Sequence, residues 1–325
     1  MNTRRQILTK IVRWSIFLLC TAYIVRFFAL NTDDIMLVTR LKPLAVTGIV
    51  VLSALAHLIF CFRFQAVLKK CTGKSVPFFH WLRLVVLGRF LTLLTPQAGN
   101  VYSSIMLKKH YGIPHTRYIS SFFSFVWTDT CVNVLVAMVL VLLVQPQLTI
   151  GGISAIYLLV GIFLVVFLVP VIIEWILSTM TFNNPRLVWI HGRLSEMFGI
   201  SMGNIKDPAF MAKFLAGGLL AFADAIGVFY ICFRSLDLPV SIPALALFYV
   251  VMRLSTLIVL TPGNLGVREI AYGIIGKNLN ITMGQGILIS MIIRVIATTV
   301  IIALGALLGG IDLFRHRKNL LKQAD

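Results

Sequence analysis

The sequence predicts an all-α polytopic membrane protein with six transmembrane helices and two re-entrant elements, arranged as a 3+3 inverted-topology repeat. Composition is the first observation: 59% of the 325 residues are hydrophobic and 12% are charged, whereas about a quarter of the residues of a soluble protein carry a charge. The second is that apolar stretches of about 20 residues, the length that crosses a bilayer, recur along the whole chain. The third is a Leu-Thr-Pro motif that occurs once in each half.

Six apolar stretches are long enough to span the membrane. They cover residues 11–30, 44–62, 118–144, 152–178, 210–233 and 284–313. The first of them follows basic residues in the manner of a signal peptide, but no A-x-A-like cleavage site follows it, so we predict an uncleaved span. Two further apolar segments, 84–95 and 243–261, each contain an arginine and lead into a Thr-Pro pair.

The distribution of basic residues indicates whether these two segments cross the membrane. If neither spans the membrane, cytoplasmic segments hold 20 lysines and arginines and external segments hold 5. If both span it, the numbers become 14 and 11. Cytoplasmic loops are enriched in basic residues, so we predict that both segments are re-entrant, with both termini in the cytoplasm and the chain in the inner membrane of the cell. The first segment would enter from the cytoplasm and the second from outside.

The net charge of +18 also reflects membrane topology, because the basic residues cluster between the spans, as is usual for the cytoplasmic loops of membrane proteins. Nucleic acid is therefore not an expected partner. One cluster, assigned to a cytoplasmic loop, is either a topology signal alone or a binding site for anionic headgroups: Arg63, Lys69, Lys70 and Lys74.

The motif LTPQAGN at residues 94–100 recurs as LTPGNLG at residues 260–266. Each copy follows two spans and an arginine-bearing segment and precedes a third span. Because three is an odd number, the second half would be inverted relative to the first. We therefore predict one integrated membrane domain made of two repeats. The first repeat covers 1–151 with its re-entrant element near 84–111, and the second covers 152–325 with its re-entrant element near 243–278.

Both motifs contain the residue types that break a helix. Proline removes a backbone donor, and glycine adopts conformations closed to other residues. Each restarted helix would point the positive end of its dipole into the membrane interior, where an anionic group could bind. An ordinary Pro-Gly loop is the structural alternative for either copy. The candidate substrate-binding residues are Arg89, Thr95, Pro96, Gly99, Asn100, Arg253, Thr261, Pro262, Gly263, Gly266, Arg268 and Glu269.

Charged residues also lie inside apolar stretches, namely Arg89, Asp129, Glu174, Asp224, Arg253 and Arg294. A charge near the bilayer centre costs at least about 2.5–3.5 kcal/mol, so it usually faces a partner or a wet cavity. Asp129 and Arg294 occupy near-equivalent positions in the two repeats, and we predict that they line the repeat interface and could bridge. Together with Asp224 they are candidate coupling residues, with a structural hydrogen bond as the alternative for Asp224. Glu174 lies near a span end and could reach the interface instead.

Catalytic and metal-binding motifs are not found in the sequence. TGKS at residues 72–75 ends like a P-loop, but Leu68 stands where the first glycine of that loop would be. The five cysteines have no C-x-x-C spacing, the six histidines are dispersed, and the few acids are isolated. We therefore expect no enzyme activity, no cofactor and no metal.

The two motifs resemble those of the lysylphosphatidylglycerol synthase transmembrane, or flippase-like, family. GNLGVREI with the preceding Thr-Pro is similar to the Pro-Gly-Gly-x-Gly-x-x-Glu motif of that family, and LTPQAGNVYSSIMLKKHYGIP is similar to its first-half motif. The resemblance implies Asp129 and Arg294 as the charges in the spans that follow the motifs. The resemblance also implies, position by position, that the motif residues of this chain are Pro96, Gly99, Pro262, Gly263, Gly266, Arg268 and Glu269.

The chain departs from that family pattern at two positions. Asn100 stands where the family often has glutamate, a difference that bears on proton or headgroup coupling at the first motif, and Asn264 replaces the second glycine. This sequence also lacks the soluble aminoacyl-transfer domain of the full synthases. We therefore do not expect the chain to aminoacylate lipids.

The resemblance and the charge pattern together predict a flippase-like transporter that moves an anionic phospholipid or a lipid-linked saccharide across the inner membrane. Its partners would be membrane lipids, and it could also form a homo-oligomer or bind a partner transferase. The headgroup would lie between the two broken helices, in contact with Arg253 and Arg268. The acids available to carry a proton would be Asp129, Asp224 and Glu269. A small-solute permease and a membrane-embedded lipid transferase, or its non-catalytic partner, are the alternatives.

Overall fold

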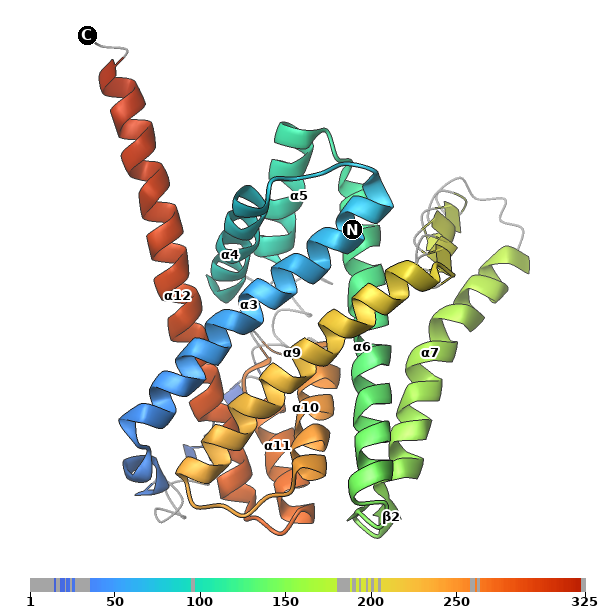
Figure 1. Ribbon diagram of the computed structural model, residues 1–325, viewed down its shortest axis with the longest axis vertical. Coiled ribbons are helices and arrows are strands. Elements are labelled where there is room, and N and C mark those ends of the chain that lie inside the picture. The colour runs from blue at the N-terminus through green and yellow to red at the C-terminus, as the bar shows by residue number, and fades with distance from the viewer. Residues whose placement is uncertain are drawn as a thin grey trace.

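The structure is a computed structural model that describes residues 36–94, 97–179, 206–257, 261 and 264–322, with single residues and short stretches between 15 and 26 and between 188 and 203. The described residues are mostly helical (Figure 1), as the composition predicts. The one sheet within these ranges is an antiparallel hairpin of two short strands, β1 (Thr149–Ile150) and β2 (Ile153–Ser154). The hairpin lies at the point where the sequence predicts that the first repeat ends.

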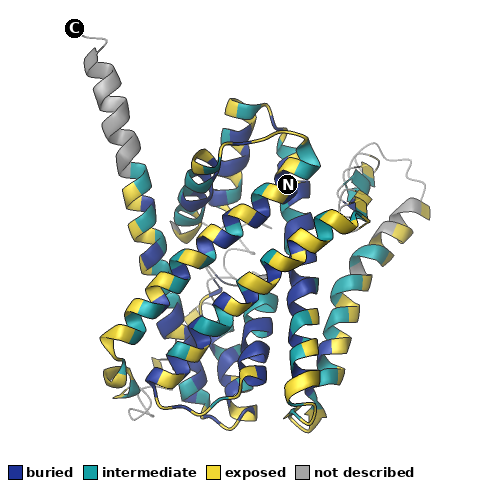
Figure 2. Ribbon diagram, in the orientation of Figure 1, coloured by how far each residue is buried: buried dark blue, intermediate teal, exposed yellow. Residues whose placement is uncertain are grey.

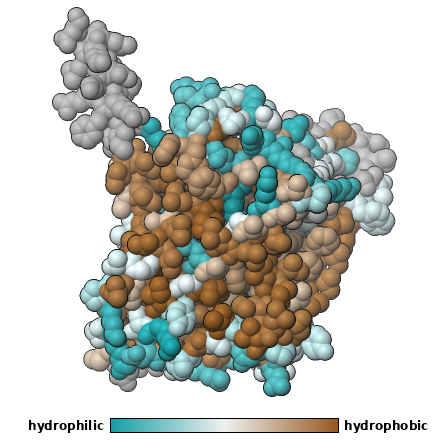
Figure 3. Space-filling model, viewed as in Figure 1, coloured by the Kyte–Doolittle hydropathy of each residue, from teal (hydrophilic) through white to brown (hydrophobic). Residues whose placement is uncertain are grey.

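Within the described residues, five helices are long and apolar enough to cross a membrane: α3 (Pro43–Thr72), α6 (His115–Val144), α7 (Ala155–Thr179), α9 (Pro208–Ser235) and α12 (Met283–Lys322). They coincide with five of the six predicted spans. The remaining predicted span, 11–30, falls mostly outside the described residues. On the face that Figure 3 shows, hydrophobic residues form a broad band across the middle, and hydrophilic residues gather towards the two ends. The chain is therefore a multi-pass membrane protein.

Two pairs of shorter helices follow α3 and α9. The first pair is α4 (Phe78–Leu94) and α5 (Ala98–Tyr111), and the second is α10 (Ile242–Leu257) and α11 (Val267–Asn278). A Leu-Thr-Pro motif lies at the junction within each pair. In Figure 1 the first pair lies in the upper half of the bundle and the second in the lower half. Each pair also contacts a long helix from the other half of the chain, because α4 packs on α12 and α10 packs on α6.

Local sequence sets several helix boundaries. A short 3-10 helix, η1 (Leu37–Arg40), precedes α3, and Gly73 ends α3 with a φ of 67°, which glycine adopts without strain. Asp207 accepts a hydrogen bond from the Phe210 N–H at the start of α9 and ion-pairs with Lys70 of α3. Lys70, together with the Phe210 N–H, holds the pKa of Asp207 below its usual range. These contacts join α3 and α9 at one end of the bundle.

Two hydrophobic cores fill the bundle, and the inward faces of the long helices are buried in both (Figure 2). One core, which includes Phe248 and Tyr272, lies mainly between α9, α10, α11, α12 and the C-terminal half of α6. The other, which includes Phe64 and Trp81, lies mainly between α3, α4 and the N-terminal half of α6. Because α3, α6 and α9 pass from one core into the other, residues near their midpoints lie where the cores meet.

The helices α4 and α5 approach each other closely at two glycines. A Cβ atom added at Gly99 would lie 2.0 Å from the carbonyl oxygen of Gly88. The Gly99 N–H also donates to Oγ1 of Thr92 at 3.2 Å. The first turn of α5 is therefore fixed against the last part of α4.

We predict that Gly99→Ala destabilises the protein, because the added methyl group must push α5 away from the backbone of α4. Overpacking of this kind typically costs about 1–3 kcal/mol, so we expect a lower midpoint of thermal unfolding in detergent. Gly161→Ala on α7 is the matched control, since no atom lies within 4 Å of a Cβ placed there. Equal stability of the two variants would show that the contact between α4 and α5 relaxes easily.

Candidate functional site

A cavity of about 230 Å³ lies where the two hydrophobic cores meet. Its walls come from α3, α4, α6, α9, α10 and α12, so both halves of the chain contribute to it. Most of the lining side chains are apolar. The titratable ones are His57, Arg63, Arg89, Asp129, Asp224, Tyr249 and Arg253.

Helical spacing places these side chains on common faces. On α3, residues His57, Phe60 and Arg63 recur every three positions, and on α9 Asp224 and Val228 are four positions apart. Residues three or four apart lie on the same face of a helix. Both α3 and α9 therefore present a mixed polar and apolar face to the cavity, close to their midpoints.

Asp129 of α6 lies between two arginines. Its Oδ1 is 2.5 Å from Nη1 of Arg63, and its Oδ2 pairs with Nη2 of Arg253. The side chains of Asp129 and Arg63 are 3% and 7% exposed, and that of Arg253 is 21% exposed. Removing one member of a buried pair leaves an uncompensated charge, which is strongly destabilising. These ion pairs join α6 to α3 in the same half of the chain and to α10 in the other half.

Arg63 is further held by aromatic and small residues. Its guanidinium carbon lies 5.5 Å from the ring centroid of Phe125 and 4.5 Å from that of Phe214, both within the range of cation–π attraction. Gly217 of α9 leaves room for the side chain, because a Cβ there would lie 3.1 Å from Cγ of Arg63. The long stem of Arg63 is thus packed as part of the core.

The assignment of Arg63 to a cytoplasmic loop is wrong. The predicted span ended at residue 62, but α3 continues to Thr72 and Arg63 is only 8% exposed. A hydropathy profile ends a span at an arginine because it cannot include the distant Asp129 that neutralises it. The signal that could have identified Arg63 is its spacing of three residues from Phe60, which continues the inward face of α3.

Arg89 of α4 also lines the cavity, and it forms a hydrogen bond with a histidine. Its Nη1 lies 2.8 Å from Nδ1 of His57. A guanidinium can only donate, so Nδ1 accepts and the ring proton of a neutral His57 is on Nε2. The Arg89 guanidinium also lies 4.0 Å from the ring centroid of Phe60. Among the described residues, no carboxylate forms an ion pair with Arg89.

Asp224 of α9 is the second acid of the cavity. It is 7% exposed, and its Oδ1 is buried. In the part of the chain that the structure describes, this oxygen has no hydrogen-bond partner. Among the described residues Asp224 also forms no ion pair, whereas each carboxylate oxygen of Asp129 lies within ion-pair distance of a guanidinium group.

Four residues predicted for the site come together at the cavity, namely Arg89, Asp129, Asp224 and Arg253. The described residues of the first motif do not line it. Asn100 donates to Oε1 of Gln97 at 2.9 Å and accepts from the Tyr118 hydroxyl at 3.2 Å, while Gly99 packs on α4. The residues at the break itself lie outside the described residues: Thr95 and Pro96. The side chain of Glu174 also lies outside them.

The second motif folds onto α12. Glu269 accepts a hydrogen bond from the Gly266 N–H at 2.7 Å and ion-pairs with Nε of Arg294 at 2.9 Å. Arg294 also donates to the carbonyl of Asn264 at 3.2 Å, and the Thr261 hydroxyl donates to the carbonyl four residues further on. The other two residues of the turn lie outside the described residues: Pro262 and Gly263. The turn is thus closed by its own glutamate and tied to the last span.

The predicted bridge between Asp129 and Arg294 is wrong. Asp129 pairs with Arg63 and Arg253, whereas Arg294 pairs with Glu269, so the two residues belong to separate clusters. Arg268 lies in the second cluster, where its guanidinium is 5.5 Å from the ring centroid of Tyr272, and it is not among the residues that line the cavity. The basic contacts of the cavity are instead Arg63, Arg89 and Arg253.

A metal site is not indicated by the residues that the structure describes, since they include no group of three or more His, Cys, Asp or Glu that could hold an ion. The polar groups of the cavity are mainly guanidinium donors. Such donors are suited to carboxylate or phosphate oxygens and not to a cation.

Membrane-length helices around a buried, charged cavity define a polytopic membrane protein with an internal polar site. Residues 7–305 match the family model described as the lysylphosphatidylglycerol synthase TM region. The chain therefore belongs to this family, as its motifs predict, and the family relates it to lipid handling. A comparison with curated proteins finds no match.

We predict that Asp129→Asn lowers the free energy of unfolding by about 3–5 kcal/mol, because it leaves two buried guanidinium groups without their shared carboxylate. Arg253→Gln should cost less, since Arg63 still neutralises Asp129. Unfolding of the purified variants in detergent measures both effects, with Asp237→Asn in the loop after α9 as the control. An Asp129→Asn protein as stable as this control would contradict the proposed role of the ion pairs.

We also predict a strong coupling between Glu269 and Arg294. A double-mutant cycle with Glu269→Gln and Arg294→Gln should give an interaction energy within the range of about 0.5–3 kcal/mol found for contacting residues. The comparison is the ion pair of Arg117 and Glu196, in which Nε and Oε1 are 3.1 Å apart and the side chains are 44% and 28% exposed. For such an exposed pair an interaction energy of about 0–1 kcal/mol is expected. A coupling no larger than that of the exposed pair would mean that Arg294 does not hold the turn.

Proposed function

We propose that this chain carries the headgroup of an anionic lipid, either a phospholipid or a lipid-linked saccharide, across the inner membrane through the central cavity. The observation that carries the proposal is the charge of the cavity, where Arg63, Arg89 and Arg253 outnumber Asp129 and Asp224. Charged side chains inside the membrane are costly and usually mark the path of a substrate or ion. Guanidinium groups bind phosphate oxygens through paired hydrogen bonds. An anionic phosphate group therefore suits this cavity.

The size and the apolar walls of the cavity favour a lipid over a free solute. A volume of about 230 Å³ is below the range of about 300–1,000 Å³ of pockets that enclose a drug-sized ligand. It suits a headgroup, while the acyl chains would stay in the bilayer. Apolar residues such as Phe60, Phe125 and Met252 lie beside the arginines, so the lining is amphipathic like a lipid.

An inverted repeat would explain why both halves of the chain build the cavity. In this proposal α4 with α5 and α10 with α11 are the two re-entrant elements. Their opposite positions in Figure 1 and their exchanged contacts, α4 with α12 and α10 with α6, support it. So does the packing of α3 on α9, which are the second spans of the two predicted repeats. Transporters of this kind hold their substrate near the midplane, between the repeats.

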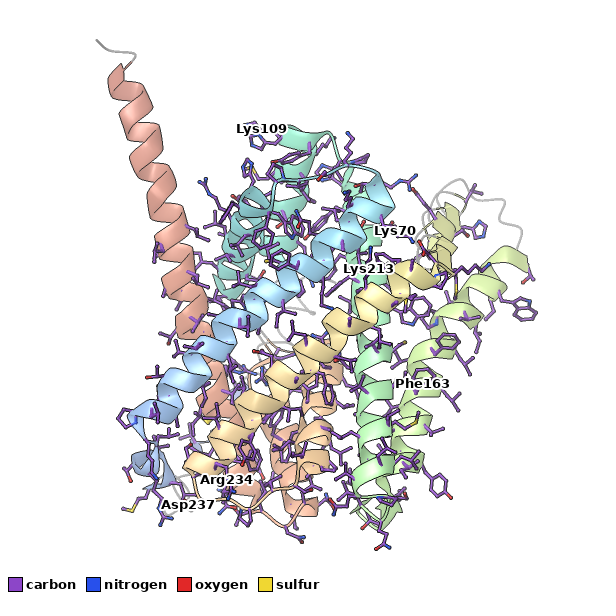
Figure 4. The ribbon with its side chains drawn as sticks, viewed as in Figure 1. Lys70, Lys109, Phe163, Lys213, Arg234 and Asp237 are labelled. Carbon is purple, nitrogen blue, oxygen red and sulfur yellow. The ribbon has the colours of Figure 1, made fainter. Side chains whose placement is uncertain are left out.

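The proposed orientation has the upper end of the molecule, as drawn in Figure 4, in the cytoplasm. Lys70 and Lys109 lie towards that end, and Arg234 and Asp237 lie towards the other. Lysine and arginine are enriched on the cytoplasmic side of membrane proteins. The last helix, α12, also ends at the upper side in Figure 1, which agrees with a cytoplasmic C-terminus.

The proposal is tested by reconstituting the purified protein in liposomes that contain phosphatidylglycerol or a diphosphate-linked sugar lipid, each with a labelled headgroup. We expect wild type to move at least one of the two lipids between leaflets. Arg253→Gln should slow the movement about tenfold or more, because a hydrogen bond to a charged group contributes about 1.5–3 kcal/mol. Arg234→Gln, at the end of α9 and away from the cavity, is the matched control and should move lipid like wild type.

The outcomes of this assay separate the alternatives. Folded wild type that moves neither lipid would overturn the proposal. Uptake of a water-soluble phosphate compound by the same liposomes would identify a small-solute permease instead. Lipid movement that Arg253→Gln leaves unchanged would show that the path lies elsewhere in the protein.

A further inference from the structure

Asp129, Glu269 and Asp224 are the predicted proton carriers, and their partners in the structure differ. Asp129 pairs with Arg63 and Arg253, and Glu269 pairs with Arg294. Asp224 lines the cavity, and in the described part of the chain no cation pairs with it. A proton on either of the first two acids would compete with arginines for the same oxygens. A proton on Asp224 would displace no partner.

We propose that Asp224 is a proton-binding site of the cavity, which takes up one proton when a headgroup with two negative charges enters and stays ionised when the headgroup has one. This inference rests on the proposed function, and it names the charge of the substrate and the ion that moves with it. The proton comes from water and adds to a carboxylate oxygen of Asp224. It is released to water when the headgroup leaves.

The charges that line the cavity carry this inference. Arg63, Arg89 and Arg253 contribute three positive charges, and Asp129 and ionised Asp224 contribute two negative ones. The empty cavity therefore has a net charge of about +1, because a guanidinium group does not lose its proton in a protein. A headgroup with one negative charge makes the cavity neutral. A second negative charge leaves it at about −1 unless a proton binds, and an uncompensated charge is costly in a low-dielectric interior.

The other titratable groups that line the cavity with Asp224 are less suitable sites for that proton. They are His57 and Arg63 on α3, Arg89 on α4, Asp129 on α6, and Tyr249 and Arg253 on α10, while α12 contributes the apolar Ile293 and Ala297. Tyr249 is a neutral phenol near pH 7 and cannot take up a proton there. The arginines are already protonated.

His57 is the rival proton acceptor of the cavity. Its Nδ1 already accepts from Arg89 at 2.8 Å. Protonating Nδ1 would break this hydrogen bond and place a positive charge against a guanidinium group, whereas a proton on Asp224 breaks no contact. Replacing His57 and replacing Asp224 should therefore have different effects on proton uptake.

The first test measures protons taken up on binding. Wild type in weakly buffered detergent near pH 7 is titrated with phosphatidylglycerol, which carries one negative charge, or with a diphosphate-linked sugar lipid, which carries two. A pH indicator dye reports protons, and the quenching of tryptophan fluorescence reports binding. We expect about one proton per bound diphosphate lipid and about none per bound phosphatidylglycerol.

Variants then identify the site of the proton. Asp224→Asn holds a neutral side chain at this position and leaves the empty cavity at about +2, so it should take up no proton. It should bind the diphosphate lipid at least as tightly as wild type, about tenfold more tightly if the proton that wild type must bind costs one pKa unit at the working pH. His57→Gln should keep the uptake. Asp237→Asn, at an acid outside the cavity, is the matched control and should behave like wild type. Asp224→Glu keeps a carboxylate at this position and should restore uptake.

The outcomes separate this inference from the proposed function. Binding of both lipids with equal proton uptake, or uptake that persists in Asp224→Asn, would overturn the inference and leave the lipid site in place. Uptake lost in His57→Gln but not in Asp224→Asn would assign the proton to the histidine. Failure of wild type to bind either lipid would overturn the proposed function itself. The difference between the two lipids in wild type tests the inference even if Asp224→Asn does not fold.

Discussion

The structure depends on one constraint: a charge inside a membrane protein is costly unless it has a partner or faces a polar cavity. Asp129 meets this constraint for two arginines at once, Arg63 and Arg253. The three residues belong to α6, α3 and α10, so the same contact that neutralises the charges also joins the two halves of the chain. A buried ion pair adds little stability over an apolar contact of the same shape, but it is strongly destabilising to break. It therefore fixes which helices must meet at the cavity.

The hydrophobic packing on either side gives that contact its position. One core lies around Phe248 and Tyr272 and the other around Phe64 and Trp81. Helices α3, α6 and α9 run through both cores, and their polar residues come near the midpoints, where the two cores meet. Small residues then make room for the large charged ones, as Gly217 does for Arg63. The cavity is thus a consequence of where the polar residues interrupt the apolar faces.

The two motifs contribute to this arrangement through the helices that they connect. Gly99 in the first motif brings α5 against α4, which carries Arg89 into the cavity. Glu269 in the second motif closes the turn after α10, which carries Arg253, and ties it to Arg294 of α12. In the described residues, the motifs position the arginines of the cavity and do not line it. This differs from the expectation that the helix ends at the motifs contact the headgroup directly.

The sequence by itself determined the membrane class, five of the spans that the structure describes, the family, and four of the charged residues of the cavity. These follow from local properties: hydropathy along a helix, proline and glycine at a break, and the cost of a charge in an apolar run. Only the tertiary structure decided the partners. It placed Arg63 in α3 beside Asp129, separated Asp129 from Arg294, and left Asp224 apart from the arginine pairs. The physical reason is that pairing depends on how helices far apart in the chain cross, and no single segment contains that information.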